Sequence, residues 1–168
     1  ITTGIAKRSK SLLEALKLYC HSAPIKPNEE EIHVLNGVVK VDGDYGKPPT
    51  FIPEKKFCVN RLNINYAPEI WEHRYYPEHF QTFLLQLLDL EDILTLQEYL
   101  GYCLIPSTRA QTALFIIGNG GEGKSRIGVV LNAIFGSAML SGNFQRVEDD
   151  KFFRYNLMNK LIMNDDDM

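Results

Sequence analysis

The chain has 168 residues, of which 45% are apolar, 11% aromatic and 23% charged, so it can bury a sizeable core and is not a disordered tail. Eighteen Lys and Arg residues against twenty-one Asp and Glu residues give a formal net charge of −3. That balance excludes a protein that holds polyanions by its overall charge, so any contact with nucleic acid has to be local. No apolar run approaches the roughly 20 residues that a membrane span needs, and we expect a cytoplasmic protein with no membrane partner.

The N-terminal region predicts a basic amphipathic helix. From Lys7 to Cys20, apolar residues recur at three- and four-residue steps with charges between them, which is the spacing of a helix with one apolar face. The polar face either contacts DNA phosphates or is simply solvated. Its basic residues are Lys7, Arg8, Lys10 and Lys17.

The next region predicts β-structure. Two β-branched stretches, 31–35 and 38–41, flank the pair Asn36-Gly37, which tolerates the positive φ angles of a type I′ turn. We therefore expect a β-hairpin that turns at this pair. After a loop rich in Gly, Asp and Pro, the stretch 57–66 is strand-like.

A cluster of aromatic and basic residues precedes two predicted helices. Such a mixture can stack on bases, or its rings pack the joint between the β part and the helices. Helical periodicity follows at 80–87 and 93–104, with Asp89 as the cap between them. The cluster consists of Trp71, His73, Arg74, Tyr75 and Tyr76.

The strongest signal is a glycine-rich loop between an apolar strand and an amphipathic helix. The run Ala113–Ile117 leads into Gly118–Ser125, which fits the pattern G-x-x-x-x-G-K-[ST] at every fixed position. The glycines let the backbone aim its N–H groups at a triphosphate, and the helix adds the positive end of its dipole. Lys124 should reach the β- and γ-phosphates of ATP, and the Ser125 hydroxyl should ligate Mg²⁺. The predicted nucleotide-binding residues are Gly118, Asn119, Gly120, Gly121, Glu122, Gly123, Lys124, Ser125 and Arg126.

A second apolar strand, Lys160–Met163, leads through Asn164 into three aspartates. A nucleotide site needs one carboxylate near Mg²⁺ and another that polarises the attacking water. By register, Asp165 or Asp166 should hold the metal through water, and Asp166 or Asp167 should act on the nucleophile. A solvated acidic turn is the ordinary alternative. The expected catalytic residues are therefore Lys124, Asp166 and Asp167, and the expected metal ligands are Ser125, Asp165 and Asp166.

The order of these elements predicts the fold class. A short strand near 138–141 and a helix near 148–158 complete a β-loop-α-β-α-β order, which is typical of a parallel α/β sheet. We expect an α/β P-loop NTPase preceded by a small, mixed α+β, mainly helical accessory domain. The accessory domain should cover residues 1–107 and the first half of the ATPase domain residues 108–168, with Pro106–Thr108 at the boundary.

These residues resemble the superfamily 3 helicases of the phage and plasmid primase-helicase family, which includes the poxvirus primase-helicase. The likeness rests on the Asn36-Gly37 hairpin with Asn65–Pro68, on Leu96–Leu104, and on the phosphate loop with its close acidic strand. The resemblance implies an AAA+-like parallel sheet and ATP hydrolysis that drives movement along single-stranded or forked DNA. It also implies a homo-hexamer that acts in phage or mobile-element replication, in the cytoplasm of a bacterial host or a virus-infected cell.

The sequence departs from the family pattern at two loop positions. Members commonly carry Asn before the Gly-Lys-Ser and Thr after it, where this chain has Glu122 and Arg126. We expect a modest effect on affinity, because backbone amides make the cradle. The family's DNA-contacting hairpin, polar sensor and arginine finger follow the acidic strand, and a further strand inserts between that strand and the phosphate-loop strand. We therefore expect these 168 residues to be a fragment, truncated after the Walker B strand, that hydrolyses ATP poorly alone.

Two other functions fit the phosphate loop. A small-molecule or nucleotide kinase uses the same loop, although no acceptor site or lid is evident in the sequence. A nucleotide-regulated module would bind ATP in order to recruit DNA or a replication partner without unwinding, and the aromatic cluster suits that role. Stimulation of ATPase activity by single-stranded DNA separates a helicase from both.

Overall fold

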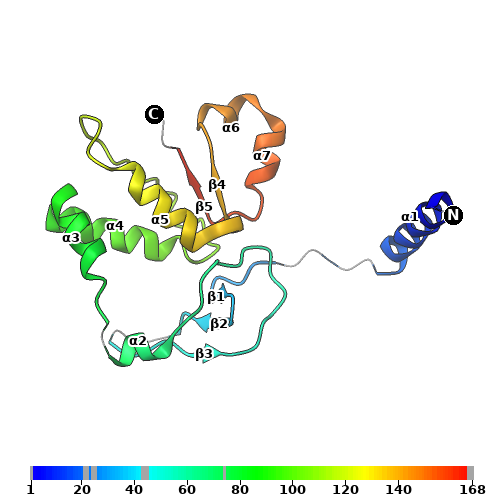
Figure 1. Cartoon of the computed structure of the whole chain (residues 1–168), viewed down its shortest axis with the longest axis horizontal. Helices are drawn as coiled ribbons and strands as arrows, with labels where there is room; N and C mark the ends of the chain where they lie inside the picture. Colours follow the sequence, from blue (N-terminus) through cyan, green and yellow to red (C-terminus); the bar gives the residue numbers. More distant parts are fainter. Residues whose placement is uncertain (1, 21–22, 24–25, 43–45, 74, 166–168) are drawn as a thin grey trace.

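The computed structural model describes residues 2–20, 23, 26–42, 46–73 and 75–165, with side chains from Arg8 onward (Figure 1). It is an α/β mixture with one antiparallel sheet of order β1-β2-β3 and one parallel pair, β4-β5. In the described ranges, no helix is both long and apolar enough to cross a membrane. The helices are α1 (Thr2–Tyr19), α2 (Pro68–Glu72), α3 (Glu78–Leu87), α4 (Leu90–Tyr102), α5 (Ser125–Phe135), α6 (Gln145–Asp149) and α7 (Lys151–Leu157), with the 3₁₀ turn η1 (Gly136–Ala138). The strands are β1 (Glu31–Val34), β2 (Gly37–Lys40), β3 (Phe51–Ile52), β4 (Met139–Ser141) and β5 (Ile162–Asn164).

The predicted hairpin is confirmed, but its turn is not where we expected it. β1 pairs with β2 so that Val34 faces Gly37, which leaves Leu35 and Asn36 as the turn residues. Neither has a positive φ, so the prediction of a type I′ turn at Asn36-Gly37 is wrong. Gly37 instead begins β2, where a Cβ atom would lie 2.2 Å from the backbone oxygen of Ile52. The glycine is needed for the close approach of β3.

The strand predicted over 57–66 does not form. Its contacts with the hairpin are isolated bonds, such as the one from the Leu62 N–H to the His33 carbonyl, 2.8 Å. The Asn36 side chain also holds this segment, because its Oδ1 accepts from the Tyr66 N–H at 2.9 Å and its Nδ2 donates to the Tyr66 carbonyl at 2.7 Å. Isolated backbone bonds and the Asn36 side chain thus hold this segment where a fourth strand would have a continuous ladder.

The small sheet is joined to the C-terminal part through the end of α5. The Asn63 N–H donates to the Ile134 carbonyl at 2.7 Å, and a Cβ atom on Gly136 would lie 2.8 Å from the Asn63 Cβ. Leu62 and Phe135 are each 1% exposed. One hydrophobic cluster therefore runs through both parts of the chain, and it contains Val34, Val39, Leu62, Leu84, Leu96, Cys103, Ile127, Leu131, Phe135, Met139 and Ile162.

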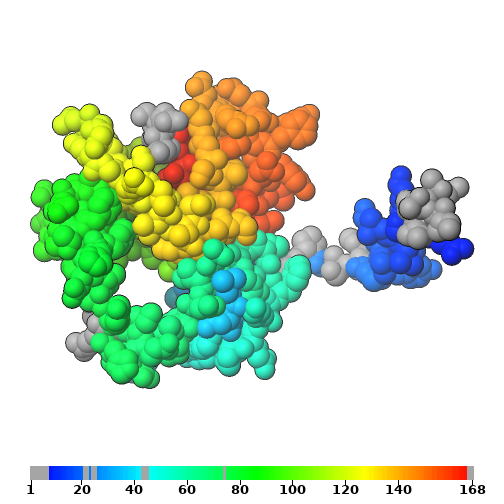
Figure 2. All heavy atoms as spheres, in the orientation of Figure 1, coloured from blue at the N-terminus to red at the C-terminus, as the bar shows by residue number. Residues whose placement is uncertain are grey.

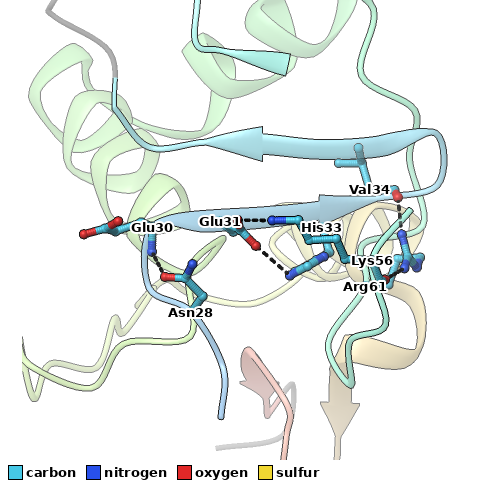
Figure 3. A network of polar contacts seen from close by, with 7 residues as sticks. All are labelled: Asn28, Glu30, Glu31, His33, Val34, Lys56 and Arg61. Atoms are coloured by element: carbon cyan, nitrogen blue, oxygen red, sulfur yellow. Dashed lines mark hydrogen bonds and ion pairs between the residues drawn. The ribbon is translucent and has the colours of Figure 1, made fainter. Parts of the chain in front are cut away.

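A polar network surrounds His33 on β1 (Figure 3). The His33 Nε2 atom lies 3.8 Å from the Glu31 carboxylate, which also forms an ion pair with Lys56. Arg61 donates to the Val34 carbonyl at 2.6 Å. The His33 side chain is 9% exposed, and its buried Nδ1 atom has no hydrogen-bond partner in the described part of the chain.

This arrangement predicts that acid destabilises the protein through His33. Burial lowers the pKa of His33 from its ordinary 6.5, with Arg61 and Lys56 adding to the effect and Glu31 opposing it. The unfolded chain therefore binds the proton first, so the free energy of unfolding falls as pH falls below 6.5. Urea unfolding at about pH 7.5 and about pH 5.5 should show a smaller difference in His33→Gln than in the wild type. An equal difference in the two proteins would contradict the prediction.

The two helices predicted over 80–87 and 93–104 are confirmed as α3 and α4. Asp89 stands at the N-cap of α4 but its side chain makes no cap hydrogen bond. The interpretation that the preceding aromatic rings pack a joint is wrong for Trp71, Tyr75 and Tyr76, which are all exposed. Arg74 lies outside the described residues.

The C-terminal part confirms the predicted parallel arrangement only in β4 and β5. Met139 pairs with Ile162, and the helix predicted between the strands forms as α6 and α7. The run 113–117 was predicted as a strand, but no strand forms there, and it has no strand partner among the described residues. Its side chains alternate, since Ile117 is 93% exposed whereas Ile116 is half-buried. The alternation of burial is the pattern expected of a strand, but the pairing that makes a strand is lacking in the described part of the chain.

Candidate phosphate-binding site

The loop before α5 requires glycine for two different reasons. Three of its glycines have a positive φ, Gly120 at 87°, Gly121 at 72° and Gly123 at 93°, where other residues are strained. At the fourth, Gly118, a Cβ atom would lie 2.0 Å from the Glu122 Oε2 atom and 2.7 Å from the Lys124 Nζ atom. The loop thus folds back so that two charged side chains lie directly on its first glycine.

The loop leads straight into the N-terminus of α5, which begins at Ser125. Within the described chain, the N–H groups of Gly121, Gly123 and Lys124 donate no hydrogen bond, whereas the Arg126 N–H is bonded to the Gly123 carbonyl at 2.9 Å. No acidic residue occupies the first turn of the helix. Unbonded N–H groups and the positive end of a helix dipole together favour an anion at this position.

A carboxylate already lies beside the loop lysine. The Glu122 Oε2 atom is 3.2 Å from the Lys124 Nζ atom, with side chains 41% and 24% exposed respectively. A phosphate that binds Lys124 has to share or displace this partner. Glu122 therefore lowers the net positive charge of the loop.

We predict that Glu122→Gln strengthens binding of a triphosphate. Because the ion pair is partly solvated, its contribution is about 1 kcal/mol or less, and the dissociation constant should fall by about two- to fivefold. Titration with a fluorescent ATP analogue measures the change. Glu69→Gln, the same substitution on exposed α2, is the matched control and should leave affinity unchanged. Weaker binding by Glu122→Gln would show that the carboxylate supports the loop instead of competing with phosphate.

A cavity of about 310 Å³ joins the loop to the acidic strand. Gly118 and Lys124 line it from the loop, and Asn164 and Asp165 line it from the end of β5. Asp165 is held in place because its Oδ2 atom accepts a hydrogen bond from the Phe144 N–H at 2.5 Å. The structure therefore brings together the loop and the first of the three aspartates, which are forty residues apart in the chain.

The charges in this cavity are few and opposite. Lys124 and Asp165 are the charged residues among the described residues that line it. Burial raises the pKa of the Tyr99 hydroxyl on the cavity wall and that of the nearby Cys103 thiol, so both groups stay neutral at physiological pH. An anion entering the cavity meets one cation, Lys124, and two carboxylates, Asp165 on the lining and Glu122 beside the lysine.

Only some of the residues predicted to hold Mg²⁺ are found at or beside the cavity. In the described part of the chain, no group of three His, Cys, Asp or Glu side chains could hold a metal ion. Ser125 begins α5 beside the cavity-lining Lys124, although it does not itself line the cavity. Mg²⁺ in nucleotide sites takes one or two protein oxygens and completes its shell with phosphate and water, so Ser125 and Asp165 fit that donor set. Asp166 and Asp167 lie outside the described residues.

Three residues of this site were not predicted from the sequence. A Cβ atom on Gly128 would lie 3.2 Å from the Asn164 Nδ2 atom, which places α5 directly against the end of β5. The Phe83 ring of α3 lies 3.4 Å from where a Cβ of Gly123 would be. Asn164 could have been identified from its place before the aspartates, but nothing in the local sequence marks Phe83 as a neighbour of the loop.

Comparison with known proteins found no relative of this chain. No family model matches the chain, and neither a curated protein nor a solved structure matches it. The chemistry of the cavity therefore rests on its own residues: a glycine-rich loop with one lysine, and an aspartate that follows a parallel strand.

Proposed function

We propose that the chain binds ATP with Mg²⁺ at the loop end of this cavity, where Gly118, Lys124 and Asp165 line it, as a P-loop NTPase does. The observation that carries the proposal is that one cavity is lined both by Lys124 and by Asp165. A phosphate-binding loop by itself is compatible with many anions. A carboxylate that lines the same cavity supports a nucleotide with its metal ion, because the carboxylate needs a cation between itself and the phosphates.

The proposed roles follow from which residues line the cavity and which lie beside it. Lys124 binds the β- and γ-phosphates, the loop N–H groups surround the same oxygens, and Ser125 with Asp165 holds Mg²⁺. Mg²⁺ held by these residues would supply positive charge for the phosphates during transfer. Asp166 or Asp167 orients the attacking water.

The edge of β5 that is unpaired in the described chain supports the resemblance to superfamily 3 helicases. Residues 114–118 and 162–165 line the same cavity, together with Leu96, Ile127 and Leu131. Described residues pair with β5 on one side only, through β4. That family places a further parallel strand between the phosphate-loop strand and the acidic strand. Such a strand would fill the apolar part of the cavity and pair with both segments, and it would leave the end at Gly118, Lys124 and Asp165 to the phosphates.

We propose further that ATP hydrolysis drives movement on single-stranded or forked DNA, in a homo-hexamer that acts in phage or mobile-element replication. A nucleotide-regulated module that binds DNA or a partner without unwinding is the second candidate. The exposed rings of Trp71, Tyr75 and Tyr76 favour it, since exposed aromatic side chains are suited to stacking on bases.

Two measurements test these proposals in order. Titration of the protein with a fluorescent ATP analogue, with and without Mg²⁺, should show binding that Mg²⁺ strengthens, and failure to bind would overturn the nucleotide site. ATP hydrolysis is then followed with and without single-stranded DNA. Stimulation by DNA supports the motor, whereas DNA binding with ATP but without unwinding supports the module.

A further inference from the structure

α1 presents a basic, leucine-bearing surface to solvent. Every described side chain from Arg8 to Tyr19 is exposed, including Leu12, Leu13 and Leu16. The helix carries four Lys or Arg residues and one Glu. Leucines of an amphipathic helix at these positions are normally covered. Because positive charges lie beside these leucines, the complementary partner is a surface that carries carboxylates next to exposed apolar side chains.

The α3–α4 region presents the complementary surface. Residues 78–108 contain five acidic residues and no Lys or Arg. On α4, Leu90 and Leu94 are exposed, and so are Glu91, Asp92 and Glu98. Leucine and carboxylate thus alternate along the solvent-facing side of this helix.

The two helices match in spacing as well as in charge. On α1, Leu13 has Lys10 three residues before it and Lys17 four residues after it. On α4, Leu94 has Glu91 three residues before it and Glu98 four residues after it. Residues at these spacings share one helical face. When the faces meet, leucine packs on leucine, and a carboxylate lies within reach of each lysine.

We propose that α1 of one copy packs across α4 of a second copy of this chain. Figures 1 and 2 place α1 on one side of the molecule, beyond the small sheet, and α3 and α4 on the opposite side. A neighbouring copy can therefore receive the helix without any rearrangement of the donor. The leucines favour a protein surface over nucleic acid as the occupant, since phosphates would bind the lysines and leave the leucines in water.

This contact uses two different surfaces, so it is heterologous and each copy can both donate and receive a helix. Such contacts repeat into a closed ring or an open chain. The inference is independent of the nucleotide site, because neither helix face includes a residue of the phosphate loop.

The test uses two complementary charge reversals. The first variant is Lys10→Glu with Lys17→Glu, and the second is Glu91→Lys with Glu98→Lys. In each variant alone the two faces carry like charges, so sedimentation should give the mass of one copy where the wild type gives a larger assembly. An equimolar mixture should recover assemblies, because each variant then offers a face that matches one on the other.

Several outcomes would overturn the proposal. Wild-type protein that sediments as one copy at every concentration shows that no such contact forms, and unchanged mass in either variant shows that other residues make it. Separate variants that lose assembly without recovery in the mixture show that the two faces do not meet each other. Packing of α1 on α4 of the same chain would give the one-copy mass in the wild type. Circular dichroism and nucleotide titration of each variant establish that the fold and the phosphate loop are intact.

Discussion

Replacing Lys124 by alanine is expected to abolish nucleotide binding. Lys124 is the single cation among the described residues that line the cavity, and hydrogen bonds between charged groups contribute about 1.5–3 kcal/mol each. A triphosphate that loses such bonds at two phosphates should bind about 100-fold more weakly or not at all. The substitution also leaves the Glu122 carboxylate without its cation 3.2 Å away, so repulsion of the ligand adds to the loss.

Titration with a fluorescent ATP analogue measures this effect. Lys55→Ala, which removes an exposed lysine from the loop after β3, is the control for the change in net charge. Retained binding in Lys124→Ala would count against the whole assignment of the loop. Equal weakening in both variants would indicate that general charge, not contact with the phosphates, governs affinity.

Replacing Phe135 by alanine should cost about 3–5 kcal/mol of the free energy of unfolding. Phe135 is the last residue of α5 and is 1% exposed. It belongs to the cluster that contains Val34 and Leu62 from the N-terminal part together with Ile127 from the same helix. The cavity left by the ring would therefore lie in the core that both parts of the chain share.

Urea unfolding, followed by circular dichroism, measures the loss. Phe152→Ala removes the same side chain from α7, where it is 70% exposed, and should change stability by about 0.5 kcal/mol or less. If the shared core makes the protein one cooperative unit, Phe135→Ala lowers the midpoint of a single transition. A second transition that the substitution leaves unmoved would show that the two parts unfold independently.

Features that depend on near neighbours in the chain could be predicted from the sequence. The hairpin 31–40, the helices α1, α3, α4 and α5, and the strand–helix–strand order of the C-terminal part follow from periodicity and turn residues. The phosphate loop is also local, because its glycines set its backbone shape. Gly120, Gly121 and Gly123 have the positive φ angles that such a loop requires.

Features that depend on distant partners could not be predicted in this way. Asn36 looks like a turn residue from its neighbours, but in the structure its side chain binds Tyr66. A strand-like stretch becomes a strand only when a second chain segment pairs with it, and 57–66 and 113–117 lack a continuous partner in the described chain.

The candidate site likewise combines features that the sequence predicts with features that only the packing of distant elements determines. The loop pattern and the aspartates after β5 were evident from residue types and spacing. The cavity that joins Lys124 to Asp165, and the approach of Phe83 to Gly123, depend on how α3, α5 and β5 pack. Local sequence determines which backbone conformations and charges are present, whereas packing of apolar faces far apart in the chain determines which of those charges meet.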